Sequence, residues 1–149
     1  MSNSVPPIAR LAPLLPQLVL AYQRRSGELP GALRDAGRLG QRHVAMLVML
    51  AIGGPLSVSD LAQRTDMTVA HTSLVVGELA RAGLIERDHD PADRRRILVS
   101  LSGTARPAVA EMRRRNAEPV LRFLSELGED EADTFIAQLS RLLSLLRDD

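Results

Sequence analysis

The stretch PLSVSDLAQRTDMTVAHTSLVVGELARAGLIERDHDPADRRRILVSLS, residues 55–102, decides the fold. Ser57 with Asp60 three residues later is a variant of the capping box, which predicts the start of a short helix. Thr68 is placed to cap a second helix, and Gly83 stands where a left-handed C-terminal cap belongs. Two short helices joined by a tight turn are typical of a helix-turn-helix. The expected helices cover about 58–64 and 69–82.

After the second helix the apolar pattern becomes that of a β-hairpin. Residues 84–87 and 97–101 are predicted as its two strands. The sequence Asp90-Pro91-Ala92-Asp93 between them is rich in residues that favour a turn. The strands enclose a loop tipped by Arg94-Arg95-Arg96, and such a hairpin is the wing of a winged helix-turn-helix.

Helical spacing of apolar residues continues on both sides of this unit. We expect helices over about 11–25 and 41–52, a loop or short helix at 31–39, helical structure from 102 onward, and a last helix over 131–147. The first and last helices carry wide apolar stripes outside the compact unit, and a partner chain can cover them, so we expect an obligate dimer. The expected dimerisation residues are Leu14, Leu18, Phe135, Leu139, Leu142, Leu143 and Leu146.

The expected fold is therefore mainly α, of the α+β type: a winged helix-turn-helix with flanking N- and C-terminal dimerisation helices. We divide one compact protomer into an N-terminal segment and dimerisation helix at 1–34, a DNA-binding lobe at 35–101 and C-terminal dimerisation helices at 102–149. A length of 149 residues fits one domain. Two Phe, one Tyr and no Trp predict an aliphatic core.

Composition excludes several classes of protein. The absence of Cys excludes disulfides, thiol catalysis and thiolate zinc sites. A net charge of +1 gives no global basic field, although all 19 basic residues are Arg. The N-terminus lacks a basic leader region, and the apolar run 44–56 has only 13 residues, against the roughly 18–20 that span a bilayer. We therefore expect a cytoplasmic protein with no membrane partner.

Residues 55–102 resemble the winged helix-turn-helix of the multiple-antibiotic-resistance regulator (MarR) family. The resemblance rests on the short capped helix with its successor, on ARAGLIER before the first strand, and on DPADRRRILVSLS as wing and return strand. It is close over 41–102, and the flanking helices match in layout only. It implies a homodimer that binds pseudo-palindromic operator DNA, with dimerisation through the terminal helices. It often also implies a small-molecule effector that releases the DNA.

In the family motif, an Asp two residues before an Arg orients that Arg into the DNA minor groove. Asp93 and Arg95 hold these positions here, and we expect the carboxylate to hold the guanidinium. Narrow A·T minor grooves attract guanidinium groups. Arg94 and Arg96 flank the pair and are expected to contact phosphates. The alternative is a solvated, charge-balanced turn.

The recognition helix departs from the family pattern, because it has no Arg before Arg81. Strong guanine-reading Arg contacts are therefore not expected from it, and specificity rests more on the wing and on DNA shape. Its expected core-facing residues are Val69, Thr72, Val76 and Leu79. The expected DNA-binding residues of this region are Ser57, Thr68, Ala70, His71, Ser73 and Leu74. Among them His71 and Ser73 can hydrogen-bond to bases or phosphates, and Ala70 can touch a thymine methyl. The alternative for His71 is an exposed residue without a DNA role.

Other chemistry is sparse. The three His lie far apart without metal-ligand spacing, and no glycine-rich phosphate loop is present, so we expect no enzyme, no cofactor and no metal site. An effector, anionic or aromatic, is a possible partner. The residues that could line its pocket are Tyr22, His43, Met46 and Met49, and core packing is the alternative for them. The leading interpretation is a dimeric repressor. The rival is a winged-helix module that binds a ligand or a protein and has weak or lost DNA affinity.

Overall fold

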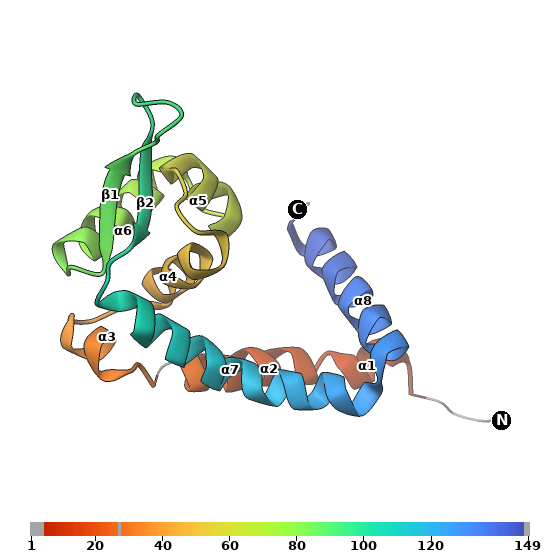
Figure 1. The fold of residues 1–149 in the computed structure, drawn as a ribbon. Coiled ribbons are helices and arrows are strands. Elements are labelled where there is room, and N and C mark those ends of the chain that lie inside the picture. The colour runs from red at the N-terminus through yellow and green to blue at the C-terminus, as the bar shows by residue number, and fades with distance from the viewer. Residues whose placement is uncertain (1–4, 27, 148–149) are drawn as a thin grey trace. The chain divides into compact units, whose positions relative to one another are not determined.

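The computed structural model describes residues 5–26 and 28–147 (Figure 1). The chain forms two compact units, one up to Arg113 and one from Arg114 onward, so the boundary falls within a long helix. The elements in chain order are α1 (Pro7–Leu11), α2 (Leu14–Ser26), α3 (Gly31–Asp35), α4 (Gln41–Gly53), α5 (Val58–Thr65), α6 (Val69–Arg81), β1 (Ile85–His89), β2 (Ile97–Leu101), α7 (Ala105–Leu127) and α8 (Glu129–Arg147).

The predicted winged helix-turn-helix is confirmed. Strands β1 and β2 pair antiparallel, with Ile85 opposite Leu101 and His89 opposite Ile97. The backbones of Leu56 and Val99 exchange two further hydrogen bonds, of 3.0 and 2.8 Å, and so tie the entrance of α5 to the hairpin. The strand predicted at 84–87 begins one residue later and extends to His89, because its pairing with β2 continues to the loop.

The predicted caps position helices α5 and α6. The Ser57 hydroxyl accepts a hydrogen bond from the Asp60 amide at 3.1 Å, and the Asp60 carboxylate accepts one from the Ser57 amide at 3.2 Å. The Thr68 hydroxyl accepts from the His71 amide at 3.2 Å. At the end of α6, Gly83 has φ +71° and the Leu84 amide donates to the Leu79 carbonyl, as in a Schellman cap.

The turn between α5 and α6 places Asp66 in the left-handed region, at φ 54° and ψ 44°. The Met67 amide donates to the Ala62 carbonyl across this turn at 3.0 Å. Asp tolerates this conformation better than most residues, since its short polar side chain bonds locally. The conformation of Asp66 thus contributes to the angle between α5 and α6.

The core of the first unit lies between α4, α5, α6, the hairpin and the start of α7. It is aliphatic, as predicted. Its fully buried large side chains are Leu33, Met46, Leu47, Leu61, Val76, Leu79, Val99, Val109 and Met112. This packing holds the two helices of the motif and the wing in one lobe.

The N-terminal helix differs from the prediction. A single helix was expected over about 11–25, but α1 ends at Leu11 and α2 begins at Leu14. The interruption coincides with Pro13, which has no amide hydrogen and whose ring clashes with the preceding helical turn. The large apolar side chains of α2 are exposed: Leu14, Leu15, Leu18, Val19, Leu20 and Tyr22.

In the second unit, the remainder of α7 leads through Gly128, at φ +80°, into α8. The rings of Phe123 and Phe135 pack edge to face with centroids 5.2 Å apart. Helix α8 starts at Glu129, two residues before the predicted start, and carries exposed leucines along its length. Over the described ranges, each helix is too short or too polar to cross a bilayer.

Candidate nucleic-acid interface

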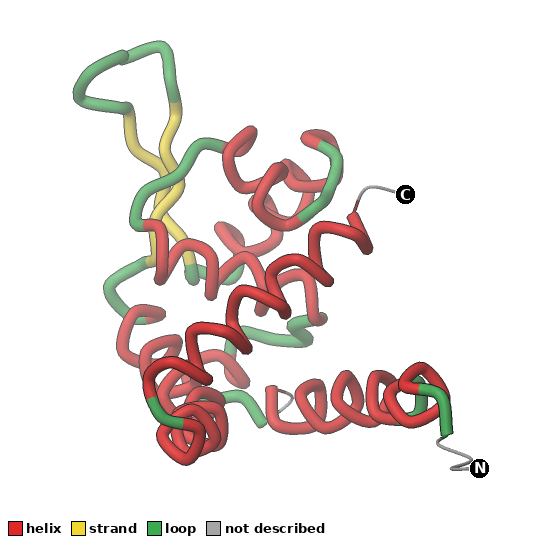
Figure 2. The backbone as a smooth tube through the Cα atoms, turned by 90° about the vertical axis from the view of Figure 1, so that its right-hand side faces the viewer, coloured by secondary structure: helices red, strands yellow, loops and turns green. Residues whose placement is uncertain are grey.

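The loop of the wing, residues 90–96, extends beyond the helices of the lobe in both views (Figures 1 and 2). Two Asp side chains shape it. The carboxylate of Asp90 accepts from the Ala92 amide at 2.8 Å, and that of Asp93 accepts from the Arg95 amide at 3.0 Å. Each is an Asx turn, in which a carboxylate binds the backbone two residues ahead. The Arg96 amide also donates to the Asp93 carbonyl at 2.9 Å, so the loop has a defined backbone.

This geometry corrects the expected role of Asp93. Its carboxylate was predicted to hold the guanidinium of Arg95, but it binds the backbone amide of Arg95 instead. Within the described residues, the guanidinium of Arg95 forms no ion pair. Arg94 and Arg95 are both exposed, and the Arg94 carbonyl accepts from Nδ1 of His89 at 2.8 Å. Asp93 therefore fixes the backbone of Arg95 and leaves its side chain exposed.

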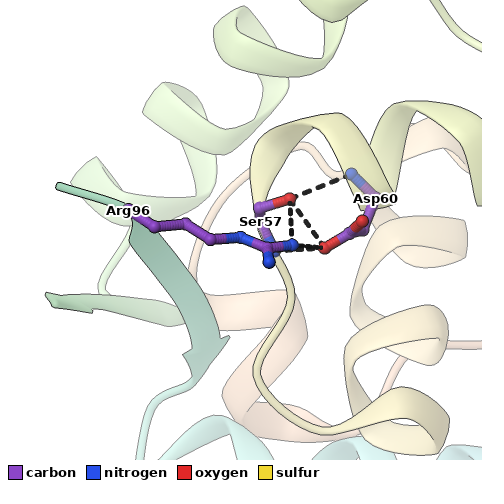
Figure 3. A network of polar contacts seen from close by, with 3 residues as sticks. All are labelled: Ser57, Asp60 and Arg96. Atoms are coloured by element: carbon purple, nitrogen blue, oxygen red, sulfur yellow. Dashed lines mark hydrogen bonds and ion pairs between the residues drawn. The ribbon is translucent and has the colours of Figure 1, made fainter. Parts of the chain in front are cut away.

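Arg96 is exposed like its two neighbours, with 47% of its side chain accessible, but unlike them it is paired with the lobe. Its guanidinium pairs with the Asp60 carboxylate and donates to the Ser57 hydroxyl at 3.2 Å (Figure 3). The Ser57 hydroxyl donates in turn to Asp60 at 2.7 Å. We call Ser57, Asp60 and Arg96 the wing latch, because it joins the end of the wing loop to the start of α5.

The wing latch also changes the pKa of one of its members, Asp60. The pKa of Asp60 is held below its ordinary value, chiefly by the hydrogen bond from the Ser57 hydroxyl. Burial has the next largest effect and opposes this by raising the pKa, and the Ser57 amide and the positive charge of Arg96 lower it further. The latch differs from the roles predicted for two of its members. Arg96 was expected on phosphate and Ser57 on DNA, but the guanidinium is already paired and Ser57 is buried.

The first turns of α6 are exposed on one side. Thr68, Ala70, Ser73 and Leu74 are exposed, as expected of residues directed at DNA. Val69 was expected in the core but is 53% exposed, because the first turn of α6 extends past the core. Val75 is buried in its place, together with the expected residues Thr72, Val76 and Leu79.

Sequence reasoning missed Arg42, at the start of α4. Its guanidinium donates to Nε2 of His71 at 2.7 Å, so an exposed Arg from α4 lies beside α6. The neighbouring residue His43 reaches the same helix, where its Nε2 is 2.7 Å from the Glu78 carboxylate. Because 29 residues separate Arg42 from His71, no local pattern could have indicated this pair.

The comparisons with known proteins agree with this geometry. The sequence model of the MarR family matches residues 39–96. The crystal structure of a probable transcriptional regulator from Pseudomonas aeruginosa is 31% identical, with 89% of this chain and 96% of that chain aligned at a TM-score of 0.61. The chain belongs to the MarR family.

Two other comparisons are informative. The HTH-type transcriptional repressor YetL of Bacillus subtilis is 26% identical over 107 residues, which is 72% of this chain and 64% of YetL. The chain thus spans less than two thirds of the length of that relative. FabT of Streptococcus pneumoniae, solved in complex with DNA, aligns with a TM-score of 0.61 over 74% of this chain and 77% of its own, at 19% identity. At that identity the likeness concerns the fold alone.

The four residues considered for an effector pocket of this MarR protein lie in different surroundings. Met46 is fully buried in the core and Met49 packs against the core, so core packing, the alternative, describes both. Tyr22 is exposed on α2. The ring of His43 is engaged at both nitrogens, since Nδ1 accepts from the Gly40 amide at 3.1 Å and Nε2 binds Glu78.

The residues predicted for MarR dimerisation lie on α2 and α8. Among them only Leu142 is partly buried, and the others are exposed in the single chain. Exposure on this scale leaves an apolar surface uncovered, and larger patches of this kind mark interaction sites. The dimer and the division of the chain into three parts stay predictions.

Proposed function

We propose that this MarR-family chain acts in the cytoplasm as a homodimeric, sequence-specific DNA-binding repressor. The observation that carries the proposal is the wing loop, where Asp93 fixes the backbone of an exposed Arg95, in the same lobe as a helix α6 whose first turns are exposed on one side. A guanidinium on a hairpin tip suits the minor groove, and a capped helix with one exposed side suits the major groove. The fold shared with the DNA-bound FabT supports the same assignment.

A homodimer is supported by the exposed leucines of α2 and α8. Two copies related by a two-fold axis would present two wings and two copies of α6 to half-sites about one helical turn, roughly 10 base pairs, apart. The operator is accordingly pseudo-palindromic. This proposal would also account for an uncovered apolar surface that a soluble monomer rarely displays.

Repression is supported by the similarity to YetL, a transcriptional repressor that aligns with 72% of this chain.

Release of the DNA by a small anionic or aromatic effector is part of the proposal because the family resemblance implies it. Its test is a thermal-unfolding screen with aromatic carboxylic acids. A compound that binds the free protein more tightly than the DNA-bound protein raises the melting temperature of the former and lowers its DNA affinity.

The deciding experiment selects binding sequences from random duplexes with the purified protein and then measures affinity over a series of salt concentrations. We expect an enriched pseudo-palindrome whose log Kobs falls by about 0.9 per phosphate contact for each unit of log salt. Recovery of no enriched sequence would refute the proposal. That result would favour the rival interpretation, a module that binds a ligand or a protein. The small number of hydrogen-bond donors on α6 would be consistent with such a module.

The double variant Leu139→Asp/Leu143→Asp tests the dimer. Two buried charges in each copy of the apolar interface would cost several kcal/mol, so we expect a monomer that loses operator binding. Light scattering and fluorescence anisotropy measure the two effects together. Gln138→Asp, an exposed change on the same helix, is the matched control and keeps both properties. A folded dimer of the double variant would show that the interface lies elsewhere.

A further inference from the structure

The exposed face at the start of α6 has an unusual composition for a helix that enters a DNA groove. Val69 and Leu74 are 53% and 67% exposed, and Ala70 and Ser73 are exposed between them. Val69 lies beside Ser73 and Ala70 beside Leu74, because residues four apart are neighbours on the surface of a helix. Residues 68–77 contain no Arg, Lys, Asn or Gln. The side chains that usually make bidentate contacts with guanine or adenine are therefore missing from this face.

Two polar side chains at the start of α6, Thr68 and His71, are already engaged, and the hydroxyl of Ser73 is the polar group exposed on this face. The Thr68 hydroxyl accepts from the His71 amide and its carbonyl accepts from the Thr72 hydroxyl at 2.9 Å. The imidazole of His71 accepts from Arg42. The buried side of the helix, which includes the fully buried Thr72, cannot turn outward without exposing the core. What α6 offers to a groove is thus chiefly an aliphatic surface.

The major groove contains one aliphatic group, the C5 methyl of thymine. We propose that α6 selects its half-site by packing Val69 and Leu74 against thymine methyl groups. This inference rests on the proposed DNA binding and names the base feature that the helix reads. The surface between these two side chains carries no charge, so it favours a methyl over the exposed hydrogen-bonding edges of a G·C pair.

The charges around this face indicate DNA as its occupant rather than an apolar peptide. Arg42 lies beside α6, held at 2.7 Å from His71, and the exposed Arg94 and Arg95 belong to the same lobe. The guanidinium at the flank of the helix suits phosphates. The guanidinium groups of the wing suit the minor groove. An aliphatic surface accompanied by such cations matches a groove lined by methyl groups and bordered by phosphates.

The experiment uses the duplex enriched by selection, in which each thymine in turn is replaced by deoxyuridine. This change removes the methyl group alone and keeps the base pair. We expect at least two thymines per half-site whose replacement weakens binding, each about fourfold, as expected for one buried methyl group. The wing reads the minor groove, where no methyl is displayed, so thymines below the wing are expected to tolerate the change.

Protein variants connect the effect to the side chains. Val69→Ala and Leu74→Ala are each expected to abolish the sensitivity to deoxyuridine at a different thymine. Ile52→Ala is the matched control, because Ile52 is also exposed but lies ten residues, about 15 Å, along α4 from Arg42. It should leave every deoxyuridine effect unchanged.

Two failures are distinguishable. If no sequence is enriched, the proposed DNA-binding function fails and this inference fails with it. If a sequence is enriched and bound, but deoxyuridine at every thymine changes affinity less than twofold, only the methyl readout is refuted. A deoxyuridine effect that persists in both Val69→Ala and Leu74→Ala would likewise refute it, because other side chains would then read the methyl groups.

Discussion

The wing loop and the start of α6 lie in the same lobe and have opposite chemistry. The loop at 90–96 holds three consecutive Arg, whereas residues 68–77 have His71 as their sole basic side chain. The loop backbone is fixed by two Asx turns and by the wing latch, and α6 is fixed by caps at both ends. Under the proposed function, this difference would separate two tasks. The charge of the wing would give affinity and salt dependence, and the helix would make the shape-specific contact.

Among variants that test this difference between wing and helix, Arg95→Ala is expected to have the largest effect on DNA affinity. Loss of a single groove contact costs about 1–3 kcal/mol per half-site, and a dimer has two half-sites. Anisotropy titrations on the selected duplex and on a scrambled one measure the loss of affinity and of discrimination. Arg141→Ala, in the second unit, removes the same charge from a residue that is not part of the wing and serves as control. Equal affinity of Arg95→Ala and the parent protein, with an unchanged circular dichroism spectrum, would rule out the wing assignment.

A smaller effect is expected at Asp93, and its sign depends on the substitution. Asp93→Asn retains a side-chain oxygen that can accept from the Arg95 amide, now at 3.0 Å, while it removes a negative charge near the DNA. We expect it to bind DNA at least as tightly as the parent. Asp93→Ala loses the Asx turn and is expected to bind several-fold more weakly, though less so than Arg95→Ala. Equal weakening by Asn and Ala in the same titration would indicate that the charge of Asp93 matters, rather than its hydrogen bond.

Arg94 and Arg96 are adjacent in sequence but are expected to differ in their effect on salt dependence. Arg94 is exposed, so Arg94→Ala should weaken binding to all sequences alike and reduce the slope of log Kobs against log salt by about 0.9 per contact. Arg96 is paired with Asp60, so Arg96→Ala should leave the slope almost unchanged. Its effect should come from a loosened wing, as a modest loss of discrimination between operator and scrambled DNA. A reduced slope in Arg96→Ala would place its guanidinium on phosphate.

The smallest effect on DNA binding, and the clearest on stability, is expected from the wing latch at low pH. The pKa of Asp60 is lower in the folded chain than its ordinary value of 3.8. Its ionised form therefore stabilises the fold above that value, and this stabilisation is lost as the pH falls through the folded pKa. Asp60→Asn should be less stable than the parent at pH 7 and should lose less stability between pH 5 and pH 3.

Urea unfolding at a fixed protein concentration, repeated across this pH range, measures that difference. Ser57→Ala, which removes the N-cap of α5, should cost about 1 kcal/mol at pH 7. Because it also removes the main cause of the lowered pKa, it should weaken the same pH dependence. Parallel pH profiles for Asp60→Asn and the parent protein would show that the latch does not contribute to stability in this range.

Much of the lobe could be predicted from sequence because its signals are local. Ser57 with Asp60, Thr68, Gly83 and the turn at 90–93 each act within a few residues, so their conformations follow from hydrogen bonds that the neighbouring backbone supplies. The same holds for the change from helical to alternating apolar spacing at the hairpin. For these elements the structure changed boundaries by one or two residues. The interruption at Pro13 was also a local signal, and sequence reasoning failed to use it.

Tertiary structure decided what depends on residues distant in the chain. The partner of Arg96 lies 36 residues away and the partner of Arg42 lies 29 residues away, so neither pairing leaves a mark in local sequence. The exposure of Val69 has a similar origin, because helical spacing gives the direction of a side chain but not the point at which the core ends. The sequence by itself thus determined which helices and strands form in the helix-turn-helix and the hairpin, and where the wing lies. Only the packing of α4, α5, α6 and the hairpin decided that Arg96 is a latch, that Arg42 stands beside α6, and that the exposed face of this helix is aliphatic.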